Sequence, residues 1–197
     1  MYKDNDMKRI GLSAGHYPEK SGAVHNELIE HELILEWIDR IFDVYDDTYD
    51  FDSQEPGFDL VPIPVGRLTE KVRFINNHDF DYVIELHFNS VGGRIVSGSE
   101  TLYMPGSNRG FEFATIVQEN IAPALQIRDR GIKEGVYWGS RERTLTPLYF
   151  LRRTNCPAII IEPEFLQSYN KTMTDEVIED FSRAFINALD EVVRLNI

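Results

Sequence analysis

Apolar and polar residues follow two different periods along this chain. Short apolar runs bounded by turn residues predict strands, and longer segments with apolar residues every three or four positions predict helices. The predicted strands cover residues 8–15, 59–65, 81–88, 99–105, 146–153 and 157–165. The predicted helices cover residues 26–42, 67–77, 107–125 and 174–196. This alternation is typical of an α/β sandwich, with a mostly parallel sheet and helices on both faces.

Local signals refine the ends of these elements. The helix at 26–42 is expected to begin after Asn26 as its N-cap and to present one apolar face, made of Leu28, Leu35, Ile38 and Phe42. The strand at 59–65 contains two prolines, which predicts a place at an edge of the sheet. The closing helix is expected to be capped by Thr174 or Asp175.

Length and composition indicate one globular domain. The chain has 197 residues, of which 42% are hydrophobic and 12% aromatic, enough to bury the core of one domain. We find no internal repeat and no Gly/Ser linker, so a single domain over residues 1–197 is expected. No apolar run approaches the roughly 18 residues of a membrane span, and the charged N-terminal residues do not resemble a secretory signal.

The charge of the chain excludes one class of partner. A net charge of −13 argues against nucleic-acid binding, because nucleic-acid binders usually carry a basic face. Much of the acid lies in residues 43–59, which are expected to form a solvated connection because they lack the ligand spacing of a calcium loop. Cys156, the single cysteine, rules out an internal disulfide and is expected to be a packing residue.

Candidate chemistry lies where predicted strands end in charge. The run DYVIELHFNS at 81–90 reaches His87, PAIIIEPEF at 157–165 reaches Glu162, and His16 follows the first strand. Glu30 lies on the first turns of the following helix. Ligands of open α/β sheets bind at the carboxyl ends of strands, and two imidazoles with one carboxylate are a ligand set for catalytic zinc. A further carboxylate would then act on the metal-bound water.

Several alternatives remain open at this level. Glu27 competes with Glu30 as the helix carboxylate, and Glu164 competes with Glu162 on the last strand, where it alternates to the opposite face. His16 could instead be a turn residue and His87 a buried, hydrogen-bonded histidine. The remaining histidines are expected on the surface or on a helix face: His25, His31 and His78. Neither HELIL at 31–35 nor ELIEH at 27–31 completes a two-histidine zinc motif.

Three blocks of the sequence resemble one enzyme family in the same order along the chain. LSAGHYPEKSGAVHNELIEHELIL, RLTEKVRFINNHDFDYVIELHFNS and LTPLYFLRRTNCPAIIIEPEFLQS are similar to the zinc-dependent N-acetylmuramoyl-L-alanine amidases of the Amidase_3 type. The resemblance implies zinc bound by His16, Glu30 and His87, and Glu162 as the catalytic carboxylate. It also implies a mixed six-stranded sheet. The implied reaction is hydrolysis of the amide between N-acetylmuramic acid and L-alanine in peptidoglycan.

The chain departs from the family pattern at three positions close to these residues. Tyr17 stands in place of a second glycine, Glu85 in place of a small residue, and Glu164 in place of a common glycine. Asn76, Asp81 and Asn89 are expected to orient loops near the site, and Asn89 is also a candidate for substrate binding. Arg152 and Arg153, at the predicted end of a strand, are candidates for pairing with stem-peptide carboxylates.

The resemblance sets further expectations about how the protein works. We expect a monomeric catalytic domain without a separate cell-wall-binding module. A phage or prophage lysis enzyme, made in the cytoplasm and released to the wall through a separate pore, would fit such a chain. Another zinc amidohydrolase or carboxypeptidase would use the same ligands on a different amide. A non-catalytic wall-binding relative would need a lost ligand or a lost glutamate.

Overall fold

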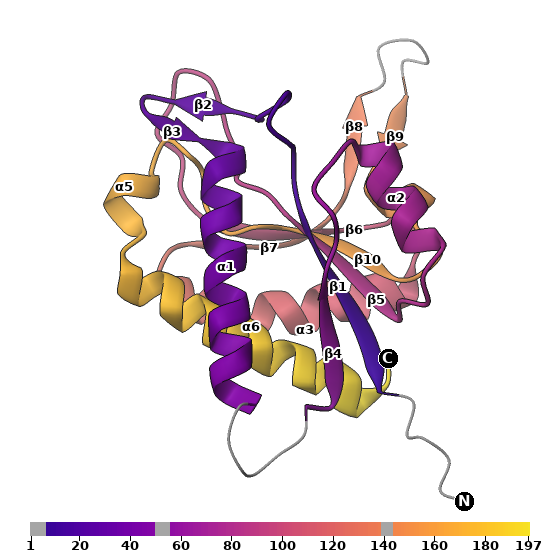
Figure 1. Ribbon diagram of the computed structural model, residues 1–197. Coiled ribbons are helices and arrows are strands. Elements are labelled where there is room, and N and C mark those ends of the chain that lie inside the picture. The colour runs from indigo at the N-terminus through magenta and orange to yellow at the C-terminus, as the bar shows by residue number, and fades with distance from the viewer. Residues whose placement is uncertain (1–6, 50–55, 139–143) are drawn as a thin grey trace, which may run out of the picture.

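The computed structural model describes residues 7–49, 56–138 and 144–197, and it is built around one six-stranded sheet (Figure 1). The strand order is β4-β1-β5-β10-β6-β7, and every neighbouring pair is parallel except β10 with β6. The strands are β1 (Lys8–Ala14), β4 (Phe58–Pro62), β5 (Tyr82–Leu86), β6 (Ser99–Tyr103), β7 (Asp129–Glu134) and β10 (Ala158–Glu162). The prediction of a mixed, mostly parallel α/β sheet is therefore confirmed.

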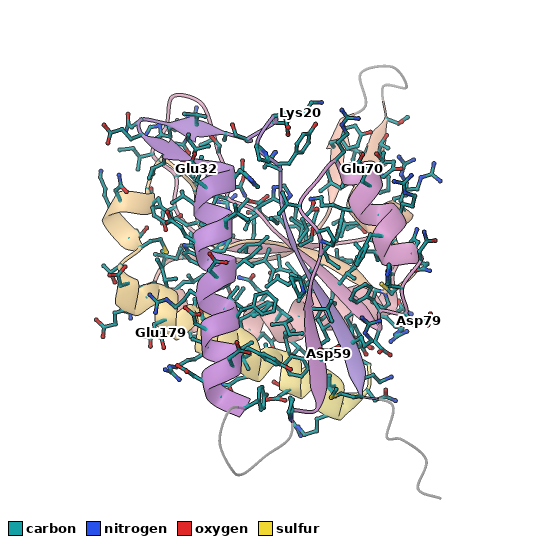
Figure 2. The ribbon with its side chains drawn as sticks, in the orientation of Figure 1. Lys20, Glu32, Asp59, Glu70, Asp79 and Glu179 are labelled. Atoms are coloured by element: carbon teal, nitrogen blue, oxygen red, sulfur yellow. The ribbon has the colours of Figure 1, made fainter. Side chains whose placement is uncertain are left out.

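Helices cover both faces of the sheet. On one face lie α1 (Glu30–Tyr49), α3 (Asn108–Leu125) and α6 (Asp175–Leu195), with α6 packed against both α1 and α3 (Figure 1). The other face is covered by α2 (Leu68–Asn76) and α4 (Tyr149–Arg153). Exposed acidic side chains such as Glu32 and Asp79 lie on the outer surface (Figure 2). Among the described residues, no helix is both long and apolar enough to span a bilayer.

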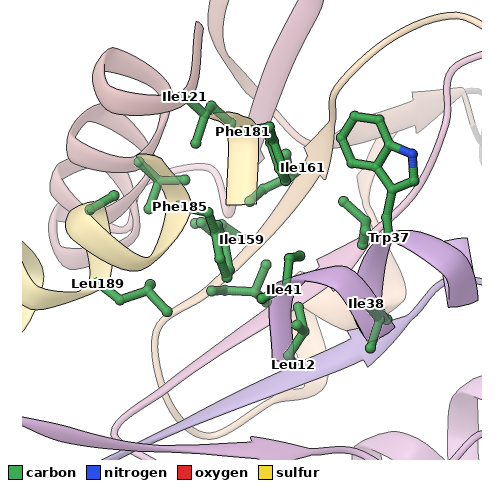
Figure 3. Close-up of a cluster of buried hydrophobic side chains, with 14 of the residues drawn as sticks. Leu12, Trp37, Ile38, Ile41, Ile121, Ile159, Ile161, Phe181, Phe185 and Leu189 are labelled. Carbon is green, nitrogen blue, oxygen red and sulfur yellow. The ribbon is translucent and has the colours of Figure 1, made fainter. Parts of the chain in front are cut away.

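Two apolar cores explain why the central strands are apolar without alternation. On β10, Ile159 and Ile161 point into the larger core, where they meet side chains of the helices α1, α3 and α6 (Figure 3). Ala158 and Ile160 point to the opposite face and join the smaller core beneath α2 and α4. A strand covered by helices on both faces needs apolar residues at successive positions, which accounts for the run that predicted it.

Several predicted element ends are confirmed. The proline-containing strand, β4, lies at an edge of the sheet and pairs only with β1. The closing helix α6 has Thr174 as its N-cap, whose side chain accepts a hydrogen bond from the backbone N–H of Val177.

The start of the first helix was predicted wrongly. Residues 26–29, assigned to its first turn, form the turn and the second strand of a small hairpin made of β2 (Val24–His25) and β3 (Leu28–Ile29), and α1 begins only at Glu30. Asn26 is not an N-cap: it has a φ of 54° in the two-residue turn between these strands, a conformation that asparagine tolerates. The buried face of α1 is correspondingly shifted, and consists of Glu30, His31, Leu33, Ile34, Trp37, Ile38, Ile41 and Val44.

The acidic segment at 43–59 is not a loop throughout. Residues 43–49 continue α1, because Val44 is buried in the larger core and Tyr45 donates a hydrogen bond from its hydroxyl group to the carbonyl of Phe58 at 2.8 Å. Residues 58–59 already belong to β4. The middle of the expected solvated connection, residues 50–55, lies outside the described residues.

The predicted strand at 146–153 is also wrong. Only β9 (Leu145–Pro147) is extended, and it pairs antiparallel with β8 (Val136–Trp138), which the sequence did not predict. The residues that follow form α4, whose turn brings the adjacent side chains of Phe150 and Leu151 into the smaller core together. An alternating strand would have sent these two neighbours to opposite faces. The strand β7 and the short helix α5 (Tyr169–Thr172) were likewise not predicted.

Candidate metal centre

The carboxyl ends of three neighbouring strands bring the candidate residues to one edge of the sheet. His16 follows β1, His87 follows β5 directly, and Glu162 is the last residue of β10. In the register of the sheet Leu86 lies beside both Ala14 and Ile161. The backbone N–H of His87 donates to the carbonyl of Ile161 at 2.9 Å, so the two strand ends are hydrogen-bonded at the site.

His16, Glu30 and His87 form a compact group of potential metal ligands. One donor atom from each residue lies within 4.8 Å of the donors of the other two. The Glu30 carboxylate lies between the two histidines, with Oε2 at 3.1 Å from Nε2 of His16 and Oε1 at 3.1 Å from Nδ1 of His87. The two imidazole rings meet edge to face, with their centroids 4.9 Å apart. Two imidazoles and one carboxylate converging in this way suit a divalent cation such as zinc.

The Glu30 carboxylate is held in its ionised form by several donors. The side chain is buried, and its oxygens accept backbone hydrogen bonds from Ala23 at 2.8 Å and from Phe88 at 3.2 Å. Burial alone would raise the pKa of Glu30, but hydrogen bonds from His16 and His87 outweigh it and hold the pKa well below its usual range. Glu27, the rival carboxylate, is exposed in the turn between β2 and β3 and does not belong to the group.

Two glycines allow the backbone to approach these side chains closely. A Cβ atom at Gly15 would lie 2.5 Å from Cε1 of His87, and one at Gly22 would lie 2.4 Å from Oε2 of Glu30. Gly22 also has a φ of +82°, which disfavours any side chain. His16 itself has a φ of 61°, an uncommon conformation for a residue other than glycine. Such backbone strain is concentrated at functional sites.

The second nitrogen of His87 contacts a buried acid. Nε2 lies 3.0 Å from Oε1 of Glu85, and the other oxygen of Glu85 lies 2.5 Å from Nζ of Lys71. Burial would lower the pKa of His87, but the hydrogen bonds with Glu30 and Glu85 raise it to about 10. The sequence analysis did not identify Lys71. Its signal was a lysine on the apolar face of a predicted helix, at helical spacing from Leu68 and Ile75.

Glu162 and Glu164 have opposite environments. Oε2 of Glu162 is buried without a hydrogen-bond partner among the described residues, and burial raises the pKa of Glu162 to about 8. The Glu164 carboxylate, by contrast, accepts four hydrogen bonds of 2.7–2.8 Å, from Ser97 Oγ, Gly98 N, Phe165 N and Thr172 Oγ1. A carboxylate with a free oxygen and a raised pKa can exchange a proton, which favours Glu162 over Glu164 for this role.

The candidates for substrate binding occupy different parts of the molecule. Asn89 lies on the site edge, where its amide donates to Glu100 at 3.0 Å, and Glu100 is the register partner of Glu162. Arg152 and Arg153 do not end a strand: they lie in α4, before the amino end of β10, whereas Glu162 is at its carboxyl end. The structure therefore does not bring these two arginines to the histidines.

Other expectations about polar residues also need correction. Asp81 does not orient a loop near the site, because it pairs with Lys8 at 2.9 Å at the amino ends of β5 and β1. Asn76 contacts the backbone of Arg153 at 2.7 Å, so it connects the ends of α2 and α4. His31 lies on a face of α1, one of the two expected placements, but on the buried face, with Nδ1 3.4 Å from the carbonyl oxygen of Gly15.

A cavity adjoins the histidines. It has a volume of about 580 Å³, and His16, His87, Glu85 and Lys71 contribute to its wall. Its outer part is lined by residues from the loop after β1 and the start of α2: Tyr17, Lys20, Gly66, Arg67, Leu68 and Thr69. Lys20 lies at this end of the molecule, above the carboxyl end of β1 (Figure 2). Two of the three candidate ligands, His16 and His87, thus border a space open to a substrate.

Comparisons with known proteins agree with this arrangement. A family model described as N-acetylmuramoyl-L-alanine amidase, Amidase_3, matches residues 10–190. The uncharacterized protein YqiI of Bacillus subtilis is 25% identical over 189 residues, covering 93% of this chain and 84% of YqiI. The sporulation-specific N-acetylmuramoyl-L-alanine amidase of the same organism is 23% identical over 197 residues, covering 96% of this chain and 69% of the relative.

A solved structure shows that the fold is shared. The N-acetylmuramoyl-L-alanine amidase from Clostridium difficile 630 superposes with a TM-score of 0.80 at 20% sequence identity. The match covers 96% of this chain and 98% of that structure, so the whole arrangement of sheet and helices is common to both.

Proposed function

Since the chain belongs to the Amidase_3 family of N-acetylmuramoyl-L-alanine amidases, we propose that it hydrolyses the amide bond between N-acetylmuramic acid and L-alanine in peptidoglycan, using a zinc ion. The observation that carries this proposal is the convergence of donor atoms of His16, Glu30 and His87 within 4.8 Å. Glu162, at the end of a neighbouring strand, adds a buried Oε2 that finds no hydrogen-bond partner within the described part of the chain. These residues would supply the metal ligands and the proton acceptor that such a hydrolysis needs.

The three ligands fit a catalytic zinc site. Two imidazoles and a carboxylate supply three donors, which leaves a fourth position for water or substrate. Zinc in such a site lowers the pKa of its bound water and polarises the substrate carbonyl. The backbone N–H groups of Ala23 and Phe88 orient the Glu30 carboxylate, so it needs little rearrangement to act as a ligand.

Glu162 would move the proton in this reaction. Its side chain is held at the end of β10, next to the backbone that hydrogen-bonds with His87. A buried carboxylate is a better base than an exposed one because burial destabilises its ionised form. Glu162 can therefore take a proton from the attacking water and return it to the amine of L-alanine as that group leaves.

The products of digestion test the bond that is cut. Purified peptidoglycan should release stem peptides with a free L-alanine amino terminus and leave glycan strands with an intact lactyl carboxylate. No new reducing sugar ends are expected, because a glycosidase uses one carboxylate as acid and a second as nucleophile or base, whereas Glu30 here contacts both histidines as a proposed metal ligand. Mass spectrometry of the soluble products distinguishes these outcomes. Cleavage only at D-amino-acid cross-links would assign the protein to the endopeptidases or carboxypeptidases instead.

Elemental analysis tests the metal. We expect about one zinc per chain in the wild type, and a strong loss of zinc in His16→Ala and in His87→Ala, since either change leaves too few donors. Full zinc retention in both variants would contradict the proposed ligands.

A further inference from the structure

A buried ion pair lies directly behind the proposed metal site. Glu85, on the central strand β5, and Lys71, on α2, are both almost inaccessible to solvent, with side-chain exposures of 5% and 3%. Nζ of Lys71 lies 2.5 Å from Oε2 of Glu85 and 2.5 Å from the carbonyl oxygen of Ala14, at the end of β1. The pair thus connects α2, β1 and β5 at the level of the histidines.

Stability is a weak explanation for this pair. Removing two charges from water is costly, and replacing a buried ion pair by apolar residues of similar volume is often neutral or stabilising. Apolar residues of the smaller core lie close to the pair in the sequence, Val72 next to Lys71 and Val83 two positions before Glu85 on the same strand. The function of the pair is therefore better explained by the second contact that Glu85 makes.

That contact is with a proposed metal ligand. Oε1 of Glu85 lies 3.0 Å from Nε2 of His87, while Nδ1 of the same ring lies 3.1 Å from Oε1 of Glu30. The two ring nitrogens therefore face two different carboxylates. Gly15 packs against the ring, where a Cβ atom would come within 2.6 Å of either nitrogen. The orientation of the His87 ring is thus restricted by a hydrogen bond at its edge and by contact with the backbone of Gly15 at its face.

We propose that Glu85, fixed by Lys71, is a positioning residue for His87: it accepts the Nε2–H of the imidazole and thereby directs Nδ1 toward Glu30 and His16. The inference rests on the proposed metal site. A histidine that donates one ring N–H to a carboxylate is held in a single tautomer, and its other nitrogen becomes a better metal ligand. Lys71 holds this carboxylate in place through the 2.5 Å contact between its Nζ and Oε2 of Glu85.

Two double variants test the hydrogen bond separately from the charges. Lys71→Met/Glu85→Gln and Lys71→Met/Glu85→Leu both remove the ion pair, but only the glutamine variant keeps an acceptor for His87. Zinc affinity, measured by competition with a chromophoric chelator, should fall about 10–100-fold in the leucine variant, which is the usual cost of losing such a partner. The glutamine variant should retain an affinity much closer to the wild type. Equal affinities in the two double variants would overturn the inference, whether both match the wild type or both are weakened.

Nuclear magnetic resonance of the wild type provides a readout that needs no variant. In the zinc-loaded protein the imidazole proton of His87 should be on Nε2 and exchange slowly with solvent. A proton on Nδ1 would overturn the proposal.

A matched control separates positioning from a general loss of a buried carboxylate. Glu164→Gln alters a buried carboxylate at the same edge of the sheet that contacts none of the three proposed ligands. It should lower the free energy of unfolding without changing zinc affinity. The same zinc-affinity measurements on His16→Ala and His87→Ala test the metal site separately from the positioning role of Glu85. If those variants bind zinc like the wild type, the metal site itself is wrong. If they lose zinc and the leucine variant does not, only the positioning role fails.

Discussion

At the scale of single residues, the environment of a side chain decides its chemistry more than its type does. Glu162 and Glu164 are two positions apart at the end of one strand, yet only Glu162 has a buried oxygen without a partner. The carboxylate of Glu164 is occupied by hydroxyl and backbone donors. The hydrogen bonds therefore separate two glutamates that strand alternation alone left as rivals.

The first prediction at this scale concerns proton transfer. Glu162→Gln should keep the fold and the bound zinc but lose most of the activity, because an amide cannot accept the proton of water. The expected loss is about 10²–10⁴-fold in kcat, the usual contribution of general acid–base catalysis. Elemental analysis and hydrolysis rates on purified peptidoglycan measure the two quantities. Normal activity in Glu162→Gln would show that another group moves the proton.

At the scale of elements, loops are attached to strand ends by buried polar side chains. Glu164 connects the end of β10 to residues 97–98 and to α5, through donors on Ser97, Gly98 and Thr172. Its side chain is fully buried, and two of its donors, the backbone N–H groups of Gly98 and Phe165, are buried as well.

We expect Glu164→Ala to destabilise the fold without removing the proposed active-site residues. Each buried donor left without a partner costs about 1–3 kcal/mol, so the free energy of unfolding should fall by at least that amount. Urea unfolding measures the change. Glu164→Gln, which keeps one acceptor oxygen, should be less destabilised than Glu164→Ala. An unchanged denaturation midpoint in Glu164→Ala would show that these hydrogen bonds contribute no net stability.

At the scale of the whole molecule, the net charge of −13 makes the stability of the fold sensitive to pH. For one buried acid, Glu100, the direction of its contribution to this pH dependence can be derived. Burial would raise the pKa of Glu100, but its contacts with Lys133 and Arg130 outweigh this and lower it. A carboxyl group with a lowered pKa in the folded state stabilises the fold at pH values above its ordinary pKa. That contribution is lost as the pH falls through the folded-state pKa.

Glu100→Gln should therefore change how steeply the free energy of unfolding depends on pH, as well as its value at neutral pH. The variant is expected to lose less stability than the wild type as the pH falls below about 4.5, the ordinary pKa of a glutamate, because the group that takes up a proton on unfolding is absent. Urea unfolding at several pH values gives the two slopes. Parallel profiles for variant and wild type would contradict a lowered pKa at Glu100.

The biological setting also belongs to this scale. Release of the enzyme to the wall during phage lysis stays a prediction. Its test is expression in a bacterial host with and without a separately produced pore-forming membrane protein. Lysis only when the pore is present would support it, and lysis without the pore would contradict the need for separate release.

Much of the fold and the principal site residues could be predicted because they depend on local patterns. Strands covered on both faces are continuously apolar, so β5 and β10 were visible as runs, and the charges at their ends marked His87 and Glu162. Where the sequence analysis misplaced elements, the deciding factor was a distant contact. Residues 26–29, which were assigned to the start of α1, belong to a hairpin. The residue before this hairpin, Ala23, donates its backbone N–H to the Glu30 carboxylate.

The sequence by itself therefore determined the α/β class, the edge position of β4 and the residues that end the central strands, since hydrophobic period and proline content act locally. Only the tertiary structure showed that Glu30, and not Glu27, lies beside the two histidines. It also showed that Arg152 and Arg153 lie away from the histidines and that Lys71 pairs with Glu85. Each of these outcomes depends on which strand ends and helix starts meet in space. Lys71 and Glu85 are 14 positions apart in the sequence, and Glu30 and His87 are 57 positions apart. The order of the strands in the sheet brings the members of each pair together. That order follows from burying both faces of the sheet at once, which no local pattern encodes.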